Sequence, residues 1–378
     1  MKVLSIGTDR KMFEEGSNVA LRTASYGGEM EELHVIVFSL SEQKFKEKKL
    51  SENVFVYPTN SFSRWLFVLD AIRLGKKIIR EKKFVRGDSV VTCQDPFECG
   101  FVGWRIAKHF RLPLHLQIHT DFLSSYFKNS FFQRFRVFVA KFLLPKAMGV
   151  RVVSKRIADS INEAGIRLKR EPRILPIRID VESIEKENGA DLAKMFPQFK
   201  FIVFMASRLT KEKRVSDAVE AFAEVSKKYP YAGLVIAGDG PLRKNLEQKS
   251  LTLGVDKNVV FLGWRDDITA LMKSAGMFLS VSEFEGYGMS VVEAGLSKCP
   301  VLSTNVGLSG SVLVHKKNSY ICSVGDIICI RDGISAFIGD NVFRYNMAQN
   351  LYSDVSSGIP SKENYVHSYV EILKETLK

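Results

Sequence analysis

Two carboxylates, Glu285 and Glu293, stand in the segment Ser282–Ala294, which reads SEFEGYGMSVVEA. The apolar run before the segment predicts a buried strand and the run after it predicts a helix, so a Gly-aromatic-Gly turn joins the two. Eight positions make about two and a quarter turns at ~3.6 residues per turn. Glu285 is therefore expected at the mouth of the turn, and Glu293 along the helix facing a pocket. Helix N-terminal N–H groups bind anions, and glycine lets the anion come close. The pattern suits a polyol attached to phosphate, which is a nucleotide sugar.

A second group of chemically able residues is the loop that follows the predicted strand 201–205. It holds Arg208 and Lys213, five positions apart. Arginine offers a two-pronged fork to phosphate and lysine offers a point charge. The two cations could grip a diphosphate from one side. A solvated charged turn is the alternative, and the Glu285 segment downstream favours phosphate binding.

Two further strand ends in the same half carry glycines. Gly238 begins a Gly-Asp-Gly-Pro turn that starts a helix, with Pro241 in the first helical turn. Gly238 and Gly240 permit close approach of backbone or ligand, although a tight structural turn fits Asp239 at least as well. Gly263 ends the next strand, where edge groups could meet a nucleobase.

In the first half, His119 follows the predicted strand 114–118, at the end that faces the cleft in this architecture. We expect it to contact substrate, whereas His115 on the same strand is expected to be structural. Gly16, in the turn before a helix, could offer its N–H to phosphate or sugar. Asp95 and Glu98 are expected to cap the helix that follows them.

The sequence lacks the motifs of several classes of enzyme. The sequence has no Asp-x-Asp and no cluster of His and carboxylates at metal-ligand spacing, so no metal site is expected. It has no Gly-x-x-x-x-Gly-Lys-Ser/Thr and no Gly-x-Gly-x-x-Gly, which argues against P-loop NTPases and dinucleotide enzymes. The substrate is then expected to be a nucleotide-sugar donor that needs no cofactor.

The elements that position these residues alternate between strand and helix throughout, which predicts parallel sheets with helices on both faces. A 378-residue chain fits two domains, and the prolines at 172 and 176 mark the join. We expect an acceptor-side Rossmann-like domain over 1–178, a donor domain over 179–361 and a helix over 362–378 that can cross back to the first domain. Predicted strands cover 3–6, 34–40, 53–57, 89–93, 114–118, 149–153, 201–205, 233–237, 259–261, 277–281 and 301–303. Predicted helices cover 17–26, 63–83, 100–110, 129–144, 214–228, 241–253, 266–274 and 290–297.

Charge is unevenly shared between the two halves. The net charge is +13, of which residues 1–189 carry 33 Lys/Arg against 22 Asp/Glu, or +11. A basic first half implies an anionic partner there. The five cysteines show no Cys-x-x-Cys spacing, which favours buried thiols in a reducing cytosol.

The residues 126–145 form a phenylalanine-rich basic stretch, YFKNSFFQRFRVFVAKFLLP. Its phenylalanines recur at helical spacing with Lys and Arg on other faces, a composition typical of interfacial membrane binders. A core-facing helix with a solvated basic side is the alternative. The basic stretch 76–86 would add attraction to an anionic membrane surface, and no aromatic-interleaved strand indicates nucleic acid. We therefore expect a cytoplasmic protein, peripheral on the inner face of the membrane.

On these motifs the second half resembles the donor domain of glycosyltransferase family 4, which has the GT-B fold. The resemblance is strong over residues 200 to 310, and looser in the first half through Gly16, Asp95–Gly100 and His119. It implies two facing Rossmann-like domains with a cleft between them, and a metal-independent transferase that retains anomeric configuration. The basic, phenylalanine-rich stretch, rather than the resemblance, indicates the acceptor, which we expect to be a glycan or a lipid-linked molecule.

The resemblance also implies roles for individual residues. Arg208 and Lys213 would hold the donor diphosphate, Glu285 the sugar hydroxyls and Glu293 the ribose. His119 would lie near the reacting centre, and Gly16 near the phosphates. The backbone of the turn would support sugar and phosphates, through Gly286, Tyr287, Gly288 and Met289.

The chain departs from the family pattern at several positions. Arg214 stands where the family usually has Gly, Ser207 stands where Gly is common, and Gly16-Ser17 replaces a Gly-Gly pair. Two alternatives stay open on this ground. One is a non-catalytic module that binds nucleotide sugars or glycans, and the other is a different GT-B enzyme such as an epimerase or a phosphorylase.

Overall fold

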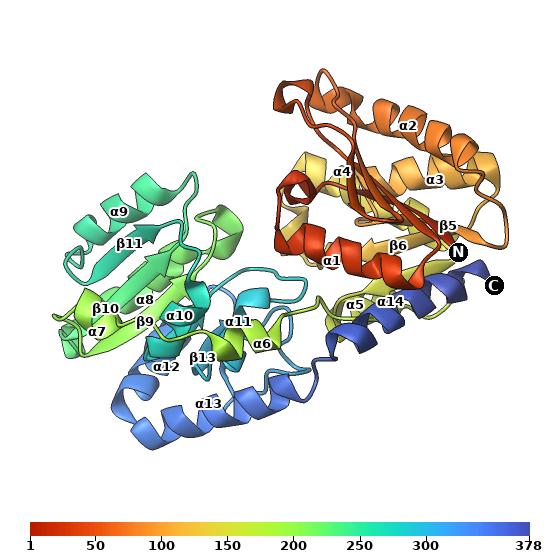
Figure 1. Ribbon diagram of the computed structural model, residues 1–378. Helices are drawn as coiled ribbons and strands as arrows, with labels where there is room; N and C mark the ends of the chain where they lie inside the picture. The colour runs from red at the N-terminus through yellow and green to blue at the C-terminus, as the bar shows by residue number, and fades with distance from the viewer. The chain divides into compact units, whose positions relative to one another are not determined.

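The computed structural model describes residues 1–378 and divides into two compact units. The first comprises Met1–Pro176 together with Pro360–Lys378, so both chain termini belong to it. The second comprises Ile177–Ile359. Each unit is a parallel sheet with helices packed against it (Figure 1).

The first unit is built on an eight-stranded sheet in the order β3-β4-β2-β1-β5-β6-β7-β8, parallel except for the β3–β4 pair. Because β2 and β5 flank β1, the order reverses between β1 and β5. Its strands are β1 (Lys2–Gly7), β2 (Glu32–Val37), β3 (Lys48–Ser51), β4 (Val54–Pro58), β5 (Ser89–Cys93), β6 (Leu114–Ile118), β7 (Gly149–Val152) and β8 (Arg173–Ile174).

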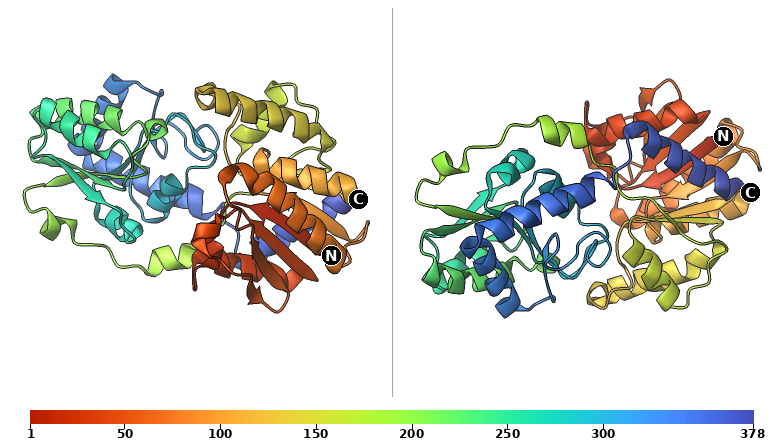
Figure 2. Two further views of the ribbon diagram at one scale, coloured as in Figure 1. Left: turned by 90° about the horizontal axis from the view of Figure 1, so that it is seen from above. Right: turned by 90° about the horizontal axis from the view of Figure 1, so that it is seen from below.

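Helices cover both faces of this sheet. Its helices are α1 (Asn18–Tyr26), α2 (Phe67–Glu81), α3 (Glu98–Phe110), α4 (Phe131–Leu143), α5 (Lys155–Glu163) and α14 (Lys362–Leu377). Helix α3 packs between α2 and α4, so these three form one layer. Helix α14 contacts α1 and strands β5 to β7 on the other face, where it lies along the sheet in the view from below (Figure 2). Buried Tyr365, Tyr369 and Leu373 carry that contact.

The second unit has a six-stranded sheet in the order β11-β10-β9-β12-β13-β14. Its strands are β9 (Phe201–Ala206), β10 (Ala232–Ala237), β11 (Val259–Gly263), β12 (Met277–Ser280), β13 (Val301–Thr304) and β14 (Tyr320–Cys322). The chain lays β10 and β11 on one side of β9 and the later strands on the other. The order therefore reverses between β9 and β12, and in open α/β sheets such a point is where ligands bind.

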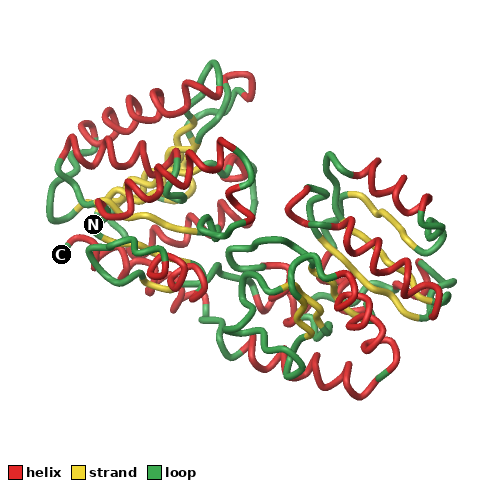
Figure 3. Tube along the Cα trace, turned by 180° about the vertical axis from the view of Figure 1, so that it is seen from behind, coloured by secondary structure: helices red, strands yellow, loops and turns green.

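The helices of the second unit enclose the sheet, seen as red tubes around yellow strands in Figure 3. They are α6 (Val181–Lys186), α7 (Leu192–Met195), α8 (Val215–Lys228), α9 (Arg243–Thr252), α10 (Ile268–Ser274), α11 (Met289–Leu296), α12 (Ile327–Gly339) and α13 (Asn341–Ser356). Helix α8 packs between α9 and α12 and buries one face rich in Ala and Val against the sheet. The rigid sheet and α8 hold the loops at the carboxyl ends of β9 and β12.

The predicted fold class is confirmed, and the predicted strands and helices all appear within a few residues of their expected bounds. Three short strands, β3, β8 and β14, and helices α5, α6, α7, α12 and α13 were missing from the prediction. No helix of the chain is both long and apolar enough to serve as a membrane span.

One sequence expectation about cysteine is wrong. Cys322 and Cys329 form a disulfide between the end of β14 and the first turn of α12. Their spacing gave no signal, because the pairing depends on the turn that folds α12 back onto β14. The other three cysteines, Cys93, Cys99 and Cys299, are buried thiols as expected.

Candidate functional site

The charged side chains that are best suited to bind a substrate lie at the point where the strand order of the second sheet reverses. Strand β9 leads into the loop 207–213, and β12 leads into the turn 281–288. Because β9 and β12 are neighbours, their carboxyl ends bring these two segments together. Ligands of open α/β sheets bind at such a point.

Arg208 and Lys213 sit on the first of these segments but differ in their surroundings. Arg208 is largely exposed, and its only contact is a long one, 3.5 Å from Nη2 to Oε1 of Glu212. Its remaining donors face solvent and are free for phosphate. Lys213, at the end of the short 3-10 helix Lys211–Lys213, is mostly buried and forms an ion pair with Glu285. The two segments are therefore linked directly by a pair of opposite charges.

The turn after β12 is fastened at its base. The Thr304 hydroxyl, at the end of β13, donates to the carbonyl of Ser282 at 2.6 Å. The Ser282 hydroxyl in turn donates to Glu285 Oε1 at 2.8 Å. Glu285 thus holds two donors, one from Ser282 and one from Lys213. Sequence reasoning named both charged residues, but it missed that they pair with each other.

Gly288 ends the turn in the left-handed region, with φ 94° and ψ 57°, and serves as N-cap of α11. A side chain would be strained there, so glycine is required by the backbone. Gly286 and Tyr287 are buried, and Met289 is the first residue of α11. The predicted strand-turn-helix arrangement is present with the bounds that the glycine pattern indicated.

Glu293 is the fifth residue of α11 and is partly buried. Its carboxylate makes no hydrogen bond or ion pair, and burial raises the pKa of that carboxyl. An ionised carboxylate is an acceptor at both oxygens. A buried acceptor without a protein partner is suited to a ligand that brings two hydroxyls.

The two glycines at the neighbouring strand ends are explained by packing. Gly238 has φ 129°, and a Cβ there would stand 1.9 Å from the carbonyl oxygen of Ser207. Its N–H donates to the carbonyl of Gly263 at 2.7 Å. The end of β10 therefore presses against the loop that carries Arg208. Gly238 allows that approach, and the carbonyl of Gly263 joins the end of β11 to the end of β10.

In the first unit, the corresponding reversal point lies between β1 and β5. Gly16 stands in the loop after β1, exposed and with φ 70°, directly before the N-cap Ser17 of α1. The Asp95 carboxylate, after β5, accepts from the backbone N–H of Phe97 at 2.7 Å and of Cys99 at 3.3 Å. Asp95 is thus the cap that the sequence predicted.

The expectation that Glu98 also caps this helix is wrong. Its carboxylate reaches instead across to Arg136 of α4, with Nη2 to Oε2 at 2.8 Å. That bidentate ion pair fastens α3 to α4. Sequence spacing could not find a partner 38 residues away.

His119 follows β6 and is partly buried. Burial, together with the positive charges of Arg151 and Arg22, lowers the pKa of His119 to about 3. The imidazole is therefore neutral near pH 7 and can serve as a hydrogen-bond donor without carrying charge. His115 is fully buried against the Thr92 hydroxyl at 2.9 Å, the structural role expected of it.

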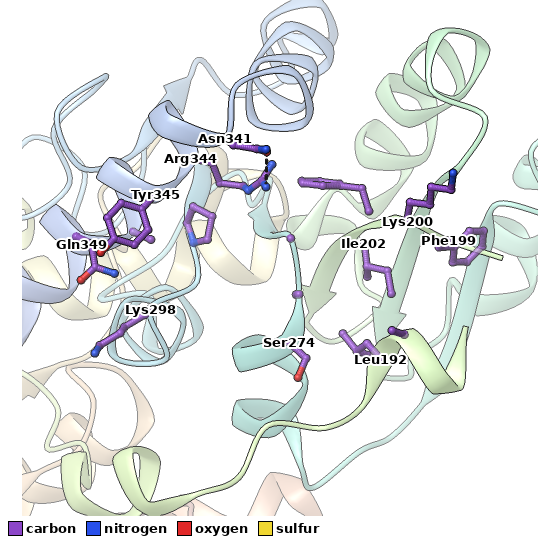
Figure 4. Close-up of a pocket in the computed structure, with 16 residues that line it drawn as sticks. Leu192, Phe199, Lys200, Ile202, Ser274, Lys298, Asn341, Arg344, Tyr345 and Gln349 are labelled. Atoms are coloured by element: carbon purple, nitrogen blue, oxygen red, sulfur yellow. Dashed lines mark hydrogen bonds between the residues drawn. The ribbon is translucent and has the colours of Figure 1, made fainter. Parts of the chain in front are cut away.

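A pocket of about 590 Å³ lies elsewhere in the second unit (Figure 4). It is lined by residues at the amino ends of the strands, among them Phe201 of β9 and Pro300 before β13, and by Arg344 of α13. The Arg344 guanidinium is bonded to Asn341 and to the carbonyl of Phe337. The pocket is thus on the opposite edge of the sheet from Lys213 and Glu285, and it is separate from the candidate site.

Two family models match the chain, one in each half. The family described as Glycosyltransferase Family 4 matches residues 17–182, and the family described as Glycosyl transferases group 1 matches residues 193–354. Between them these matches span most of the chain, including the loop 207–213 and the turn 281–288 of the second unit.

Individual relatives are more distant. N-acetyl-alpha-D-glucosaminyl L-malate synthase of Bacillus anthracis is 29% identical over 53% of this chain, and the match spans half of that protein. Alpha-monoglucosyldiacylglycerol synthase of Acholeplasma laidlawii is 26% identical, and the match covers 72% of this chain and 71% of that protein.

Solved structures share the fold over nearly the full length. HepE of Anabaena in complex with UDP-glucose has a TM-score of 0.77 at 21% identity, with 99% of each chain covered. Sucrose-phosphate synthase of Thermosynechococcus elongatus has a TM-score of 0.82 at 15% identity, with 98% of each chain covered.

Proposed function

We propose that this chain, which belongs to glycosyltransferase family 4, transfers a sugar from a nucleoside diphosphate sugar to a glycan or lipid-linked acceptor. The transfer retains anomeric configuration and takes place at the cytoplasmic face of a membrane. The observation that carries the proposal is the ion pair of Lys213 with Glu285 at the reversal point of the second sheet, beside the largely exposed cation Arg208.

The chemistry follows from where charge develops. Breaking the bond between sugar and diphosphate leaves negative charge on the departing phosphate. Lys213 is held by one carboxylate and has further N–H donors, and Arg208 has most of its five free. These two cations stabilise the leaving group. Fixed cations in a site with little water lower the barrier without reorganising during the reaction.

The carboxylates bind the neutral parts of the donor. Glu285, already fixed by Ser282 and Lys213, accepts from hydroxyls of the transferred sugar. Glu293, which has no protein partner, accepts from the two ribose hydroxyls. His119 in its neutral form donates a hydrogen bond near the reacting carbon, and the N–H groups beside Gly16 approach the phosphates.

Donor binding can be tested by thermal shift with a panel of nucleoside diphosphates and their sugars. UDP and UDP-glucose are the first ligands to try, since HepE of Anabaena was solved with them. We expect one nucleotide series to raise the melting temperature of the wild-type protein and to raise it much less in Lys213→Ala. Equal stabilisation of both proteins by every ligand would contradict the site. NMR of the anomeric proton of the product tests retention.

The second candidate function is a binding module without catalysis. The departures at Arg214 and at Gly16-Ser17 favour it, because both fall on loops that would hold phosphate. A module would bind the nucleotide sugar but release no nucleotide with any donor and acceptor. Release of nucleoside diphosphate that depends on Lys213 would rule the module out.

The membrane part of the proposal rests on the exposed surface of α4. Five phenylalanines stand in solvent there, with Phe131 87% and Phe138 67% exposed. The helix buries a different stripe, Val137, Ala140 and Leu143. These five phenylalanines therefore do not serve the core, which supports a membrane-facing role over the alternative of a core-facing helix. Exposed aromatic groups on a basic helix suit the interface of a membrane.

Positive charge surrounds this aromatic face. Helices α2, α3 and α4 form one layer, and its exposed cations are Arg73, Lys77, Arg80, Arg105, Lys108, Arg134 and Lys141. Asp70 and Glu81 of α2 pair with Arg73 and Lys77, and Glu98 pairs with Arg136, so the remaining cations of the layer have no acidic partner. Each basic side chain near an anionic surface contributes ~1 kcal/mol. The layer is thus suited to negatively charged lipid.

Vesicle sedimentation tests this surface. At low salt we expect the protein to sediment with vesicles of phosphatidylcholine and phosphatidylglycerol, but not with phosphatidylcholine alone. Changing Phe131 and Phe138 to Ser should abolish sedimentation. Tyr345→Ser is the matched control, because Tyr345 is 63% exposed on a helix of the second unit. Equal loss in the control, or sedimentation of the double variant, would contradict the assignment.

A further inference from the structure

Arg214 is an unusual residue at the start of helix α8. Its φ of 48° and ψ of 33° place it in the left-handed region, where a side chain is strained and glycine is favoured. It directly follows Lys213, so the strain lies next to the cation of the candidate site. A non-glycine residue persists in such a conformation only where its surroundings hold it.

The guanidinium of Arg214 is held from three directions. Its Nε lies 2.6 Å from Oδ2 of Asp217 in the first turn of α8. Its Nη1 lies 3.7 Å from Oε2 of Glu283 in the turn after β12. Its Nη2 packs so close to Gly325 that a Cβ there would stand only 3.0 Å away. Side chain and backbone from three separate segments therefore converge on Arg214.

The ion pair between Arg214 and Glu283 links α8 to the candidate site, because Glu283 belongs to the turn that carries Glu285. Its side chain is buried, which raises the pKa of its carboxyl, and the charge of Arg214 opposes that rise. Its backbone N–H donates to the carbonyl of Glu212 at 2.8 Å. Glu283 is thus joined to both chain neighbours of Lys213, to Glu212 by a backbone hydrogen bond and to Arg214 by an ion pair.

We propose that Arg214 is a positioning residue for sugar transfer: through Glu283 it sets the distance between the loop that carries Lys213 and the turn that carries Glu285. Arg214 acts through these neighbours and does not touch the donor, since its guanidinium already faces two carboxylates and Gly325. The inference rests on the proposed function for its catalytic consequence, but the link itself is a property of the free protein.

The link can be measured without any substrate. Arg214→Gly relieves the backbone strain and removes the ion pair, so the variant is expected to fold with a melting temperature close to that of wild type. Glu283→Gln keeps the backbone bond to Glu212 and removes the charge. In both variants we expect amide hydrogen exchange over residues 282–288 to rise about tenfold or more, while exchange in the core of α8 stays unchanged. Arg331→Ala, which breaks an exposed pair with Asp332 on α12, is the control.

The catalytic consequence has a signature that lost stability alone would not produce. Misplacement of Lys213 weakens its contact with the departing phosphate, so kcat should fall about tenfold in Arg214→Gly, and any change in the dissociation constant for nucleoside diphosphate should be the same in Glu283→Gln. Because Arg214 and Glu283 act through one contact, the variant that combines Arg214→Gly with Glu283→Gln should be no slower than Arg214→Gly alone.

Two results would overturn the inference. One is unchanged exchange over residues 282–288 in Arg214→Gly. The other is weaker binding of nucleoside diphosphate in Arg214→Gly with no such change in Glu283→Gln, which would make Arg214 a direct phosphate ligand. If the wild-type protein transfers no sugar from any donor, the proposed function fails, and the exchange experiment still decides the role of Arg214.

Discussion

Replacing Lys213 by Met is the sharpest test of the site, because it keeps most of the apolar length of the side chain and removes the ammonium with its charge and its N–H donors. In the folded protein the ammonium is mostly buried and paired with Glu285. Methionine leaves Glu285 with a single partner, the hydroxyl of Ser282. The substitution therefore has two separable consequences, one for catalysis and one for the stability of the turn.

The two magnitudes differ. Loss of one charge-stabilising donor in a transferase site costs ~3–4 kcal/mol in the transition state, so kcat/KM should fall by about 10² to 10³. The side chains of Lys213 and Glu285 are 18% and 21% exposed, which places the pair between surface and core. Breaking it should lower the free energy of unfolding by ~1–2 kcal/mol. Once Glu285→Gln has removed the negative charge, Lys213→Met should cost less.

Initial rates of nucleoside diphosphate release measure the catalytic effect, and urea unfolding of the two single variants and the double variant measures the coupling. Lys257→Met is the control, since Lys257 is exposed just before the amino end of β11. If Lys213→Met turned over donor within about threefold of wild type, less than 1 kcal/mol would rest on this cation. The assignment of Lys213 to the leaving group would then be refuted.

Three more predictions follow from groups outside that pair. Glu293→Gln should weaken nucleoside diphosphate binding about tenfold, while binding of inorganic pyrophosphate stays unchanged in calorimetry, because the carboxylate is assigned to ribose hydroxyls. Burial lowers the pKa of His115 to about 3, compared with ~6.5 in the unfolded chain. The contribution of His115 to stability is therefore fully present above pH 6.5 and is lost as the pH falls below that value. Between pH 7 and pH 5, the free energy of unfolding should fall by ~2 kcal/mol more in wild type than in His115→Gln, measured by urea unfolding. Arg151 is buried and donates to the carbonyls of Leu175 and Pro176, so Arg151→Met should lower the free energy of unfolding of the first unit by ~2–4 kcal/mol, measured by urea titration.

The fold was predictable because its signals are local. Apolar runs that end in glycine, as before Gly238 and Gly263, mark strand ends in a parallel sheet, and helical periodicity fills the gaps between them. The elements missing from the prediction are short or depend on partners. Strand β8 has only two residues, Arg173 and Ile174, and becomes a strand because β7 lies beside it. No periodicity is visible over two residues.

The candidate site was predictable from the sequence only as separate residues, and their roles stay predictions. The types and spacing of Arg208, Lys213, Glu285 and Glu293 indicated phosphate and hydroxyl binding. The pairing of Lys213 with Glu285 spans 72 positions, and the Arg136–Glu98 pair spans 38. Such contacts follow from which strands are neighbours in the sheet. Sequence spacing carries information about one element at a time, and these pairs join two.

Arg214, with its left-handed backbone, shows how an interpretation from the sequence changes once the fold is known. From the sequence alone, an arginine where glycine is usual counts as a defect in a phosphate-binding loop, and it favoured a module without catalysis. In the folded chain the same arginine meets a buried carboxylate, Glu283, on the opposite segment of the site. A strained residue that is paired with a buried partner is more consistent with a fixed loop than with a degraded one. If the Arg214–Glu283 pair holds the loop, the arginine at a position where the family usually has glycine is no longer evidence against catalysis. Amide hydrogen exchange over residues 282–288 in Arg214→Gly therefore tests the positioning role of Arg214 and also helps to decide between the two candidate functions.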